Sequence, residues 1–199
     1  SLFDHYFLIF LLVTFIPFSS FSTTKNRWKI KLLGSKIITY DSEDFGGISG
    51  ITLSENGKSF ILISDKSHYF KGQIIRDNLN QIIDFKIKDH GQLLSSKKEL
   101  LTGRNLDSES IVKVLNRGYY ISFESNNRIM YHETLEDPGI FLPNHPDFDK
   151  LMYNDGIEAL AMKENGELYA IPELPPKGKE NHPIYSFHEN VWSIIDEIK

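Results

Sequence analysis

The sequence predicts an all-β protein: a partial β-propeller of about three to four blades that belongs to a longer propeller, preceded by an N-terminal hydrophobic signal segment. Three stretches, residues 45–65, 106–124 and 154–173, repeat one pattern of an apolar strand, a turn that contains glycine, a second apolar strand and a closing carboxylate. Such repeats are typical of propellers, because one blade cannot bury both of its faces without neighbours. Short alternating apolar runs fill the rest of the chain, and no long amphipathic helical pattern occurs.

The amino-terminal segment resembles a signal peptide. Residues 6–18 form an almost wholly apolar run, which is short for a membrane span and has the length of a signal-peptide core. Small residues at Ser20 and Ser22 suit a cleavage site, so we expect a signal peptide at 1–22 and the N-terminal part of a propeller domain at 23–199. A positive start and an initiator Met are missing, so we expect this peptide to be incomplete. The expected location is exported, periplasmic or secreted. A buried helix or an uncleaved membrane anchor remains the alternative.

The strands expected after this segment are short and alternate between apolar and polar residues. They cover residues 28–32, 36–40, 58–63, 82–87, 119–123 and 128–132, with new strands beginning at 184 and 191. The pairs Asn56-Gly57, Arg117-Gly118 and Asn165-Gly166 supply residues that adopt the left-handed conformation of tight hairpin turns. The proline-rich stretches 141–146 and 174–183 are expected to connect blades.

The spacing of the closing acids indicates how many blades are present. Asp65, Glu124 and Glu173 are separated by 59 and 49 residues, near the repeat of about 40–50 that is typical of a propeller blade. Propellers usually close with about four or more blades. We therefore expect this chain to be the amino-terminal portion of a longer protein.

Composition excludes several classes of function. The formal net charge is −5 and no basic block occurs, so nucleic acid is not an expected partner. The absence of cysteine excludes a thiol nucleophile, a thiolate metal site and a disulfide. The seven histidines lack the paired spacing of a zinc site.

Carboxylates recur at matching positions of the repeats. Glu109 and Glu158 open the second and third repeats, and Asp65, Glu124 and Glu173 close all three. Radially packed blades would bring these five acids to one end of a central channel. Carboxylates within about 6 Å raise one another's pKa, and a bound divalent cation offsets that repulsion. Since hard oxygen ligands suit Ca²⁺, the sequence predicts a divalent cation, Ca²⁺, held by these five residues.

Each of these residues also has a simpler alternative role. An acid at a strand end can accept backbone N–H bonds in a turn, or pair with Arg104 or Arg128. Three cationic side chains lie just past closing acids, where they are expected to hold an anionic substrate group. They are Lys66, His68 and Arg128. The alternative is that these three residues are solvated loop residues.

Three linked motifs resemble the bacterial phytase-like ("esterase-like activity of phytase") β-propeller family. They are residues 45–51 with 63–66, 107–111 with 121–129, and 156–161 with 169–173. The resemblance covers about residues 35–175 and implies an exported bacterial propeller. By analogy with the gluconolactonase and paraoxonase groups of calcium propellers, it implies that Glu109 and Glu158 are metal ligands. Ser110 departs from the pattern, since glycine usually follows that glutamate.

The expected function is metal-assisted hydrolysis of a small-molecule ester or phosphoester, in which the cation polarises the scissile group and activates water. Glu109 and Glu158 are the expected catalytic residues. The competing hypothesis is a non-catalytic periplasmic propeller that binds a ligand or a protein. The two hypotheses differ in geometry: the acids converge on one channel in the first and point into separate turns in the second.

Overall fold

The computed structural model describes residues 31–32, 34–114 and 117–199. The chain divides into two units, residues 1–33 and residues 34–199. The predicted signal peptide at 1–22 and most of the predicted strand at 28–32 lie outside the described residues. Within the described part of the chain, no helix combines the length and the apolar character needed to cross a bilayer.

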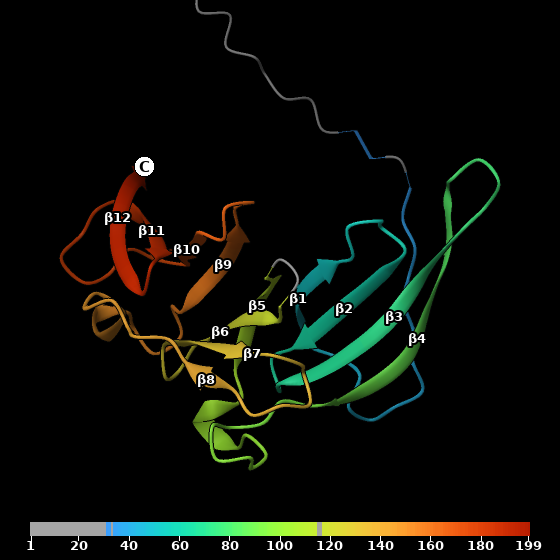
Figure 1. The fold of residues 1–199 in the computed structure, drawn as a ribbon, viewed down its shortest axis with the longest axis horizontal. Coiled ribbons are helices and arrows are strands. Elements are labelled where there is room, and N and C mark those ends of the chain that lie inside the picture. The colour runs from blue at the N-terminus through green and yellow to red at the C-terminus, as the bar shows by residue number, and fades with distance from the viewer. Residues whose placement is uncertain (1–30, 33, 115–116) are drawn as a thin grey trace, which may run out of the picture. The chain divides into compact units, whose positions relative to one another are not determined.

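The second unit consists of three four-stranded antiparallel sheets, which follow one another along the chain (Figure 1). The first sheet contains β1 (Ile48–Leu53), β2 (Ser59–Ser64), β3 (His68–Arg76) and β4 (Ile82–Gln92). The second contains β5 (Ser108–Lys113), β6 (Tyr119–Phe123), β7 (Arg128–His132) and β8 (Ile140–Phe141). The third contains β9 (Ile157–Met162), β10 (Leu168–Pro172), β11 (His182–His188) and β12 (Val191–Ile198). Two short 3₁₀ helices, η1 (Gly103–Asn105) and η2 (Phe148–Lys150), lie in the connections.

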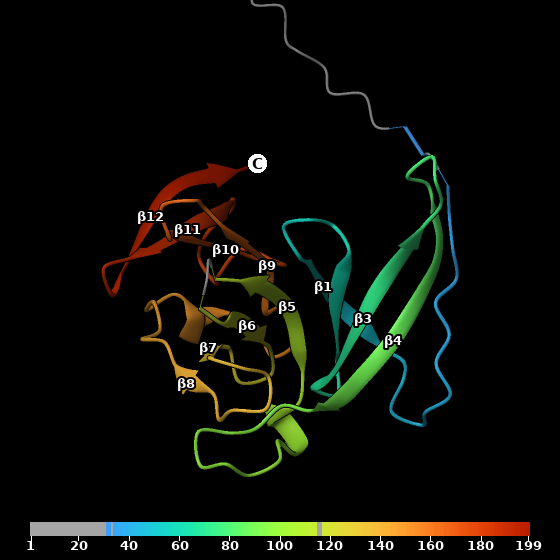
Figure 2. The same ribbon diagram turned by 45° about the vertical axis from the view of Figure 1, so that its right-hand side comes forward.

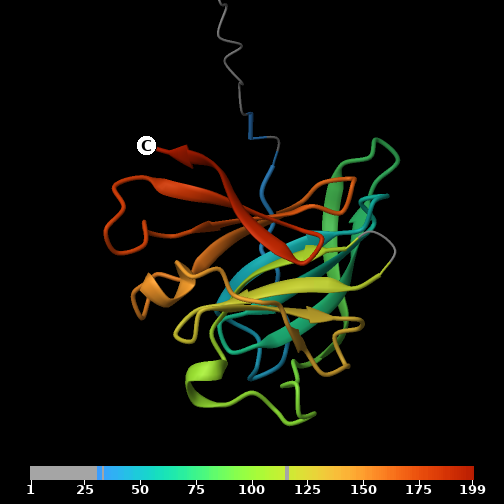
Figure 3. The same ribbon diagram turned by 60° about the vertical axis from the view of Figure 1, so that its left-hand side comes forward.

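This arrangement confirms the all-β prediction, and its three sheets are compatible with blades of a partial propeller. In each sheet the strands pair with their neighbours in sequence, as in a propeller blade. The first strands β1, β5 and β9 lie side by side in succession (Figure 2). Figure 3 shows the orange and red strands of the third sheet beside the yellow strands of the second. The expectation that further blades follow stays a prediction.

Apolar side chains fill the spaces between neighbouring sheets. One core cluster joins the first and second sheets and includes Ile63 of β2 and Ile121 of β6. Another joins the second and third sheets and includes Ile129 of β7 and Tyr185 of β11. Burying one such side chain contributes about 1.5–3 kcal/mol, so each sheet depends on its neighbour for stability. This is the physical reason why the repeats follow one another directly.

The strand predicted at residues 36–40 is wrong, because this segment forms no strand. Tyr40 instead packs edge-on against Phe45 and Phe70, and Ile38 contacts the same cluster on the first sheet. The alternating pattern at 36–40 therefore reflects packing against the first sheet and not hydrogen-bonded pairing within it. The strands that begin at residues 184 and 191 are confirmed as parts of β11 and β12.

Candidate functional site

The same irregularity occurs where each sheet begins. The pairing of the first two strands shifts between Ile48 and Gly50, between Ser108 and Ser110, and between Ile157 and Ala159. The residue left unpaired at each bulge is Ser49, Glu109 or Glu158. A bulge re-aims the side chain that it carries, and bulges are common beside active sites. The two glutamates singled out from the sequence therefore occupy equivalent backbone positions.

The closing acids are equivalent as well. The N–H group of Asp65 donates to the Gly47 carbonyl at 2.8 Å, and that of Glu173 donates to the Gly156 carbonyl at 3.0 Å. In the second sheet, the N–H group of Glu124 donates to the Asp107 carbonyl at 2.9 Å. These bonds fix each closing acid beside the residue that precedes the first strand of its own sheet.

Five carboxylates meet at this end of the second and third sheets. They form two overlapping groups, in each of which the oxygen atoms lie within 4.8 Å of one another. The groups are Asp107, Glu109 and Glu124, and Glu124, Glu158 and Glu173. Four of the five acids predicted as ligands are thus brought together, with Glu124 common to both groups.

Asp107 was missed by the sequence reasoning. Aligning the repeats places Asp107 opposite Gly47 and Gly156, which have no side chain. The second repeat alone therefore carries an acid at this position. That contrast is visible in the sequence and could have identified Asp107.

Glu124 reaches from the second sheet to the start of the third. Its Oε2 atom accepts a hydrogen bond from the Gly156 N–H at 3.3 Å. A Cβ atom on Gly156 would overlap the Cβ atom of Glu124, so only glycine allows this approach. Because the second and third sheets approach closely at Gly156, Glu124 of the second sheet can reach the acids of the third sheet.

The grouped carboxylates disfavour one another's ionisation. Burial raises the pKa of Glu109 to about 8, with further contributions from Glu158, Glu124 and Asp107. Burial also raises the pKa of Glu124, although the Gly156 N–H opposes this rise. The pKa of Glu158 is raised by burial and by the charges of Glu173 and Asp107. Among the described residues, none of the five acids has a Lys, Arg or His ion-pair partner within 4.0 Å.

This donor set fits a hard divalent cation. All five side chains offer carboxylate oxygens, the ligand type that Ca²⁺ prefers. The Oδ1 atom of Asn127 lies beside Gly156, and it is buried without a hydrogen-bond partner among the described residues. A buried oxygen without a partner is costly, and a cation would supply one.

Asp65 does not join either group. Its carboxylate is exposed and lies against Gly47, where a Cβ atom would overlap it. The bulge residue of the first sheet is Ser49, whose hydroxyl donates to the Ser108 carbonyl at 2.5 Å. The first sheet therefore supplies no acid to the grouped carboxylates.

The three predicted substrate-binding residues are not alike. Lys66 is exposed, whereas His68 is half-buried with its Nε2 atom 3.6 Å from Oδ1 of Asp44. Arg128 is only 4% exposed. Its guanidinium donates to the carbonyls of Asn105 at 2.6 Å and Asn126 at 3.0 Å.

The environment of Arg128 indicates a structural role. Its guanidinium lies 4.0 Å from the ring centroid of Phe123, and burial lowers its pKa to about 10. These contacts fix η1 against the turn between β6 and β7. The charge of Asp107 also acts on Arg128, and a contact between Arg128 and a substrate stays a prediction.

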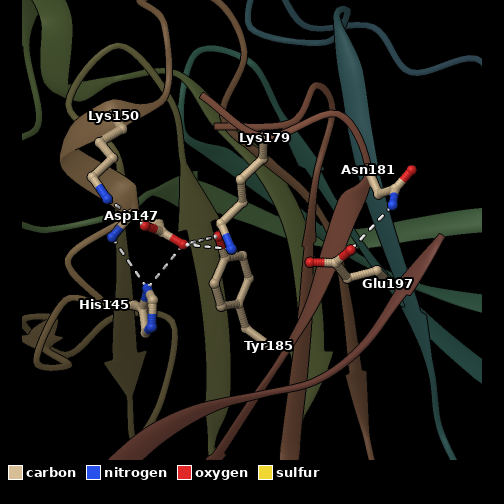
Figure 4. A network of polar contacts seen from close by, with 7 residues as sticks. All are labelled: His145, Asp147, Lys150, Lys179, Asn181, Tyr185 and Glu197. Atoms are coloured by element: carbon tan, nitrogen blue, oxygen red, sulfur yellow. Dashed lines mark hydrogen bonds and ion pairs between the residues drawn. The ribbon is translucent and has the colours of Figure 1, made fainter. Parts of the chain in front are cut away.

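A second polar network is centred on Asp147, in the loop before β9 (Figure 4). Asp147 is 5% exposed and accepts hydrogen bonds from Lys150 Nζ at 2.8 Å and Tyr185 Oη at 3.2 Å. Lys179 Nζ lies 3.5 Å from the same carboxylate. Although burial opposes it, Lys150 and Lys179 hold the pKa of Asp147 below its usual value. The network therefore joins the loop before β9 to the loop between β10 and β11.

Comparison with protein families gives one match. The model of the Phytase-like family, described as "Esterase-like activity of phytase", matches residues 43–195. That range includes all three sheets up to the middle of β12 and every one of the grouped acids. No curated protein matches the chain.

Proposed function

The chain belongs to the Phytase-like family, and on that premise we propose that it is a cation-assisted hydrolase of small esters, including phosphoesters. The observation that carries this proposal is the convergence of five carboxylates, none of which has an ion-pair partner within 4.0 Å among the described residues. Acids that serve only to cap turns have no reason to gather, because each one raises the cost of ionising the others.

The five grouped acids are the proposed ligands, with Glu124 at the centre because it belongs to both groups. When bound, a divalent cation polarises the scissile group and activates water. The protein's own contribution is to fix the carboxylates in advance through the bulges at Glu109 and Glu158 and the backbone bonds of Glu124 and Glu173. Such fixed geometry lowers the cost of organising the reacting groups.

Glu109 and Glu158 are the proposed proton-transfer residues. The pKa of each is raised above that of an ordinary glutamate, and that of Glu109 reaches about 8. These pKa values describe the protein without a cation, and a bound cation favours the ionised carboxylates. In that form each glutamate can accept a proton from an attacking water as a general base. The proposal therefore gives these two residues a role in proton transfer as well as in ligation.

We also propose that the protein is exported. The support is the apolar run at residues 6–18 and the small residues at Ser20 and Ser22. Detecting the protein in periplasmic or culture fractions, with an amino terminus near Thr23, would test this. Retention of residues 1–22 in the membrane fraction would indicate an uncleaved anchor.

The enzymatic proposal is tested with the full chain and two substrates, p-nitrophenyl acetate and p-nitrophenyl phosphate. We expect turnover with Ca²⁺, its loss in EDTA and its return when Ca²⁺ is restored. Glu109→Gln and Glu158→Gln are expected to lower kcat by at least about tenfold, since each removes a proton-transfer group. Glu164→Gln, a change at an exposed hairpin-turn acid outside both groups, is the matched control and should have no effect.

The outcomes separate the alternatives. Activity that is unchanged in EDTA would exclude a role for the cation. Calcium binding without turnover of either ester would favour a non-catalytic propeller that binds a ligand or a protein.

A further inference from the structure

We propose that Ser125 is a positioning residue that orients the carboxylate of Asp107 toward the cation. This inference rests on the cation site of the proposed function. It extends that proposal to a side chain outside the ligand set.

The contact between these two residues is direct. The Oγ atom of Ser125 donates a hydrogen bond to Oδ2 of Asp107 at 2.8 Å. The Asp107 carbonyl is held at the same time by the N–H group of Glu124 at 2.9 Å. Two adjacent residues of one turn thus restrain both the backbone and the side chain of Asp107. Because Oδ2 of Asp107 accepts this hydrogen bond, the proposal assigns the other oxygen, Oδ1, to the cation.

The backbone at Ser125 holds the hydroxyl in place. Ser125 has a φ of 58°, in the left-handed region that favours glycine. Its N–H group donates to the Tyr153 carbonyl at 3.2 Å, which ties the turn to the loop before β9. A serine in this conformation costs free energy that glycine would avoid. Its hydroxyl bond to Asp107 is the interaction that glycine could not supply.

A neutral donor suits this position. Asp107 lies beside the like charges of Glu109 and Glu124, and the positive charge of Arg128 also acts on it from beyond ion-pair distance. Without a hydrogen-bond donor, its side chain would turn away from the two glutamates. A lysine or arginine partner would hold Asp107 but would also neutralise it and compete with the cation. The serine hydroxyl orients the carboxylate and leaves its charge available. Loss of such an outer partner typically weakens metal affinity by about 10–100-fold.

The test is the Ca²⁺ affinity of the full chain, measured by titration calorimetry. Ser125→Ala and Ser125→Gly both remove the hydroxyl, but only the glycine relieves the left-handed strain. We expect both variants to bind Ca²⁺ about 10–100-fold more weakly than the wild type. We also expect the glycine variant to unfold at a higher temperature than the alanine variant. If Ca²⁺ affinity instead followed the unfolding temperature, so that only the less stable alanine variant bound Ca²⁺ weakly, the proposal would be overturned.

Two further variants show whether Ser125 acts through Asp107. In an Asp107→Ala background, adding Ser125→Gly should weaken Ca²⁺ binding no further, and an additional loss would overturn the proposal. Ser54→Ala is the matched control, because Ser54 is also half-buried and its hydroxyl donates to Asn56 Oδ1 at 2.8 Å in a hairpin turn. This control should bind Ca²⁺ as the wild type does.

The two proposals fail in different ways. If the wild type binds no Ca²⁺, both the cation site and the role of Ser125 are overturned. If the wild type binds and the Ser125 variants bind equally well, the cation site stands and the role of Ser125 is overturned.

Discussion

Replacing Glu109 with glutamine tests whether burial and the neighbouring carboxylates disfavour the ionisation of Glu109 in the metal-free protein. Burial, together with Glu158 and Glu124, raises the pKa of Glu109 from 4.5 to about 8. Between these pH values the folded protein holds a proton that the unfolded chain releases. The stability linked to this proton is complete below about pH 4.5 and is lost as the pH rises through about 8.

The size of the effect follows from the same values. A rise in pKa from 4.5 to about 8 sets an upper limit of ~5 kcal/mol, because each tenfold change in proton affinity corresponds to about 1.4 kcal/mol. Glu109 is only partly buried, so solvent screens much of this energy and we expect about 1–2 kcal/mol. For a chain of this length, that corresponds to ~2–8 °C in the unfolding temperature.

The assay is thermal unfolding in EDTA at pH 5 and pH 9. Glu109→Gln is expected to be more stable than the wild type at pH 9, and the difference should shrink at pH 5. Added Ca²⁺ should reverse the order at pH 9, because the wild type then gains a ligand that the variant lacks. A variant no more stable than the wild type at pH 9 in EDTA would refute the reasoning.

Glu167→Gln provides a control of opposite sign. Hydrogen bonds from Ser186 and Lys163 lower the pKa of Glu167 to about 2. The stability linked to its ionised form is present above about pH 4.5 and is lost as the pH falls through about 2. The glutamine variant should therefore be less stable than the wild type at both pH 5 and pH 9.

Three further predictions concern Arg128, His132 and Gly156. Arg128→Ala should lower the free energy of unfolding by about 3 kcal/mol in urea, since it removes buried hydrogen bonds and the contact with Phe123; an unchanged value would contradict a structural role. Burial lowers the pKa of His132 below 6.5, so its contribution to stability is complete above pH 6.5 and is lost as the pH falls below it. Urea midpoints at pH 7.5 and 5.5 should show a smaller drop in His132→Leu than in the wild type. Gly156→Ala should cost about 1–3 kcal/mol and weaken Ca²⁺ binding in calorimetry, because the new Cβ atom overlaps Glu124; normal stability and affinity would show that the sheets can separate there.

The sequence analysis was wrong about the strand at 36–40 and about the stretch 174–183, which joins β10 to β11 within the third sheet and does not connect two sheets. Short apolar runs bounded by turn residues predicted the strands at 119–123 and 128–132, which are buried over three consecutive residues each. The alternating pattern at 36–40 arises from packing against Phe70, which a local pattern cannot distinguish from strand pairing. Arg128 looked like a free cation at a strand end, and only the fold around Asn105 shows that it is buried.

By itself, the sequence determined the all-β class, the hairpins and the matching positions of Glu109 and Glu158, since period, turn residues and internal repeats are properties of neighbouring residues. Only the tertiary structure decided which acids meet. Glu124 crosses to Gly156 because two sheets pack closely there, whereas Asp65 stays on the first sheet against Gly47. Distances between sheets depend on how their apolar faces pack, and the spacing of residues along the chain does not determine that packing.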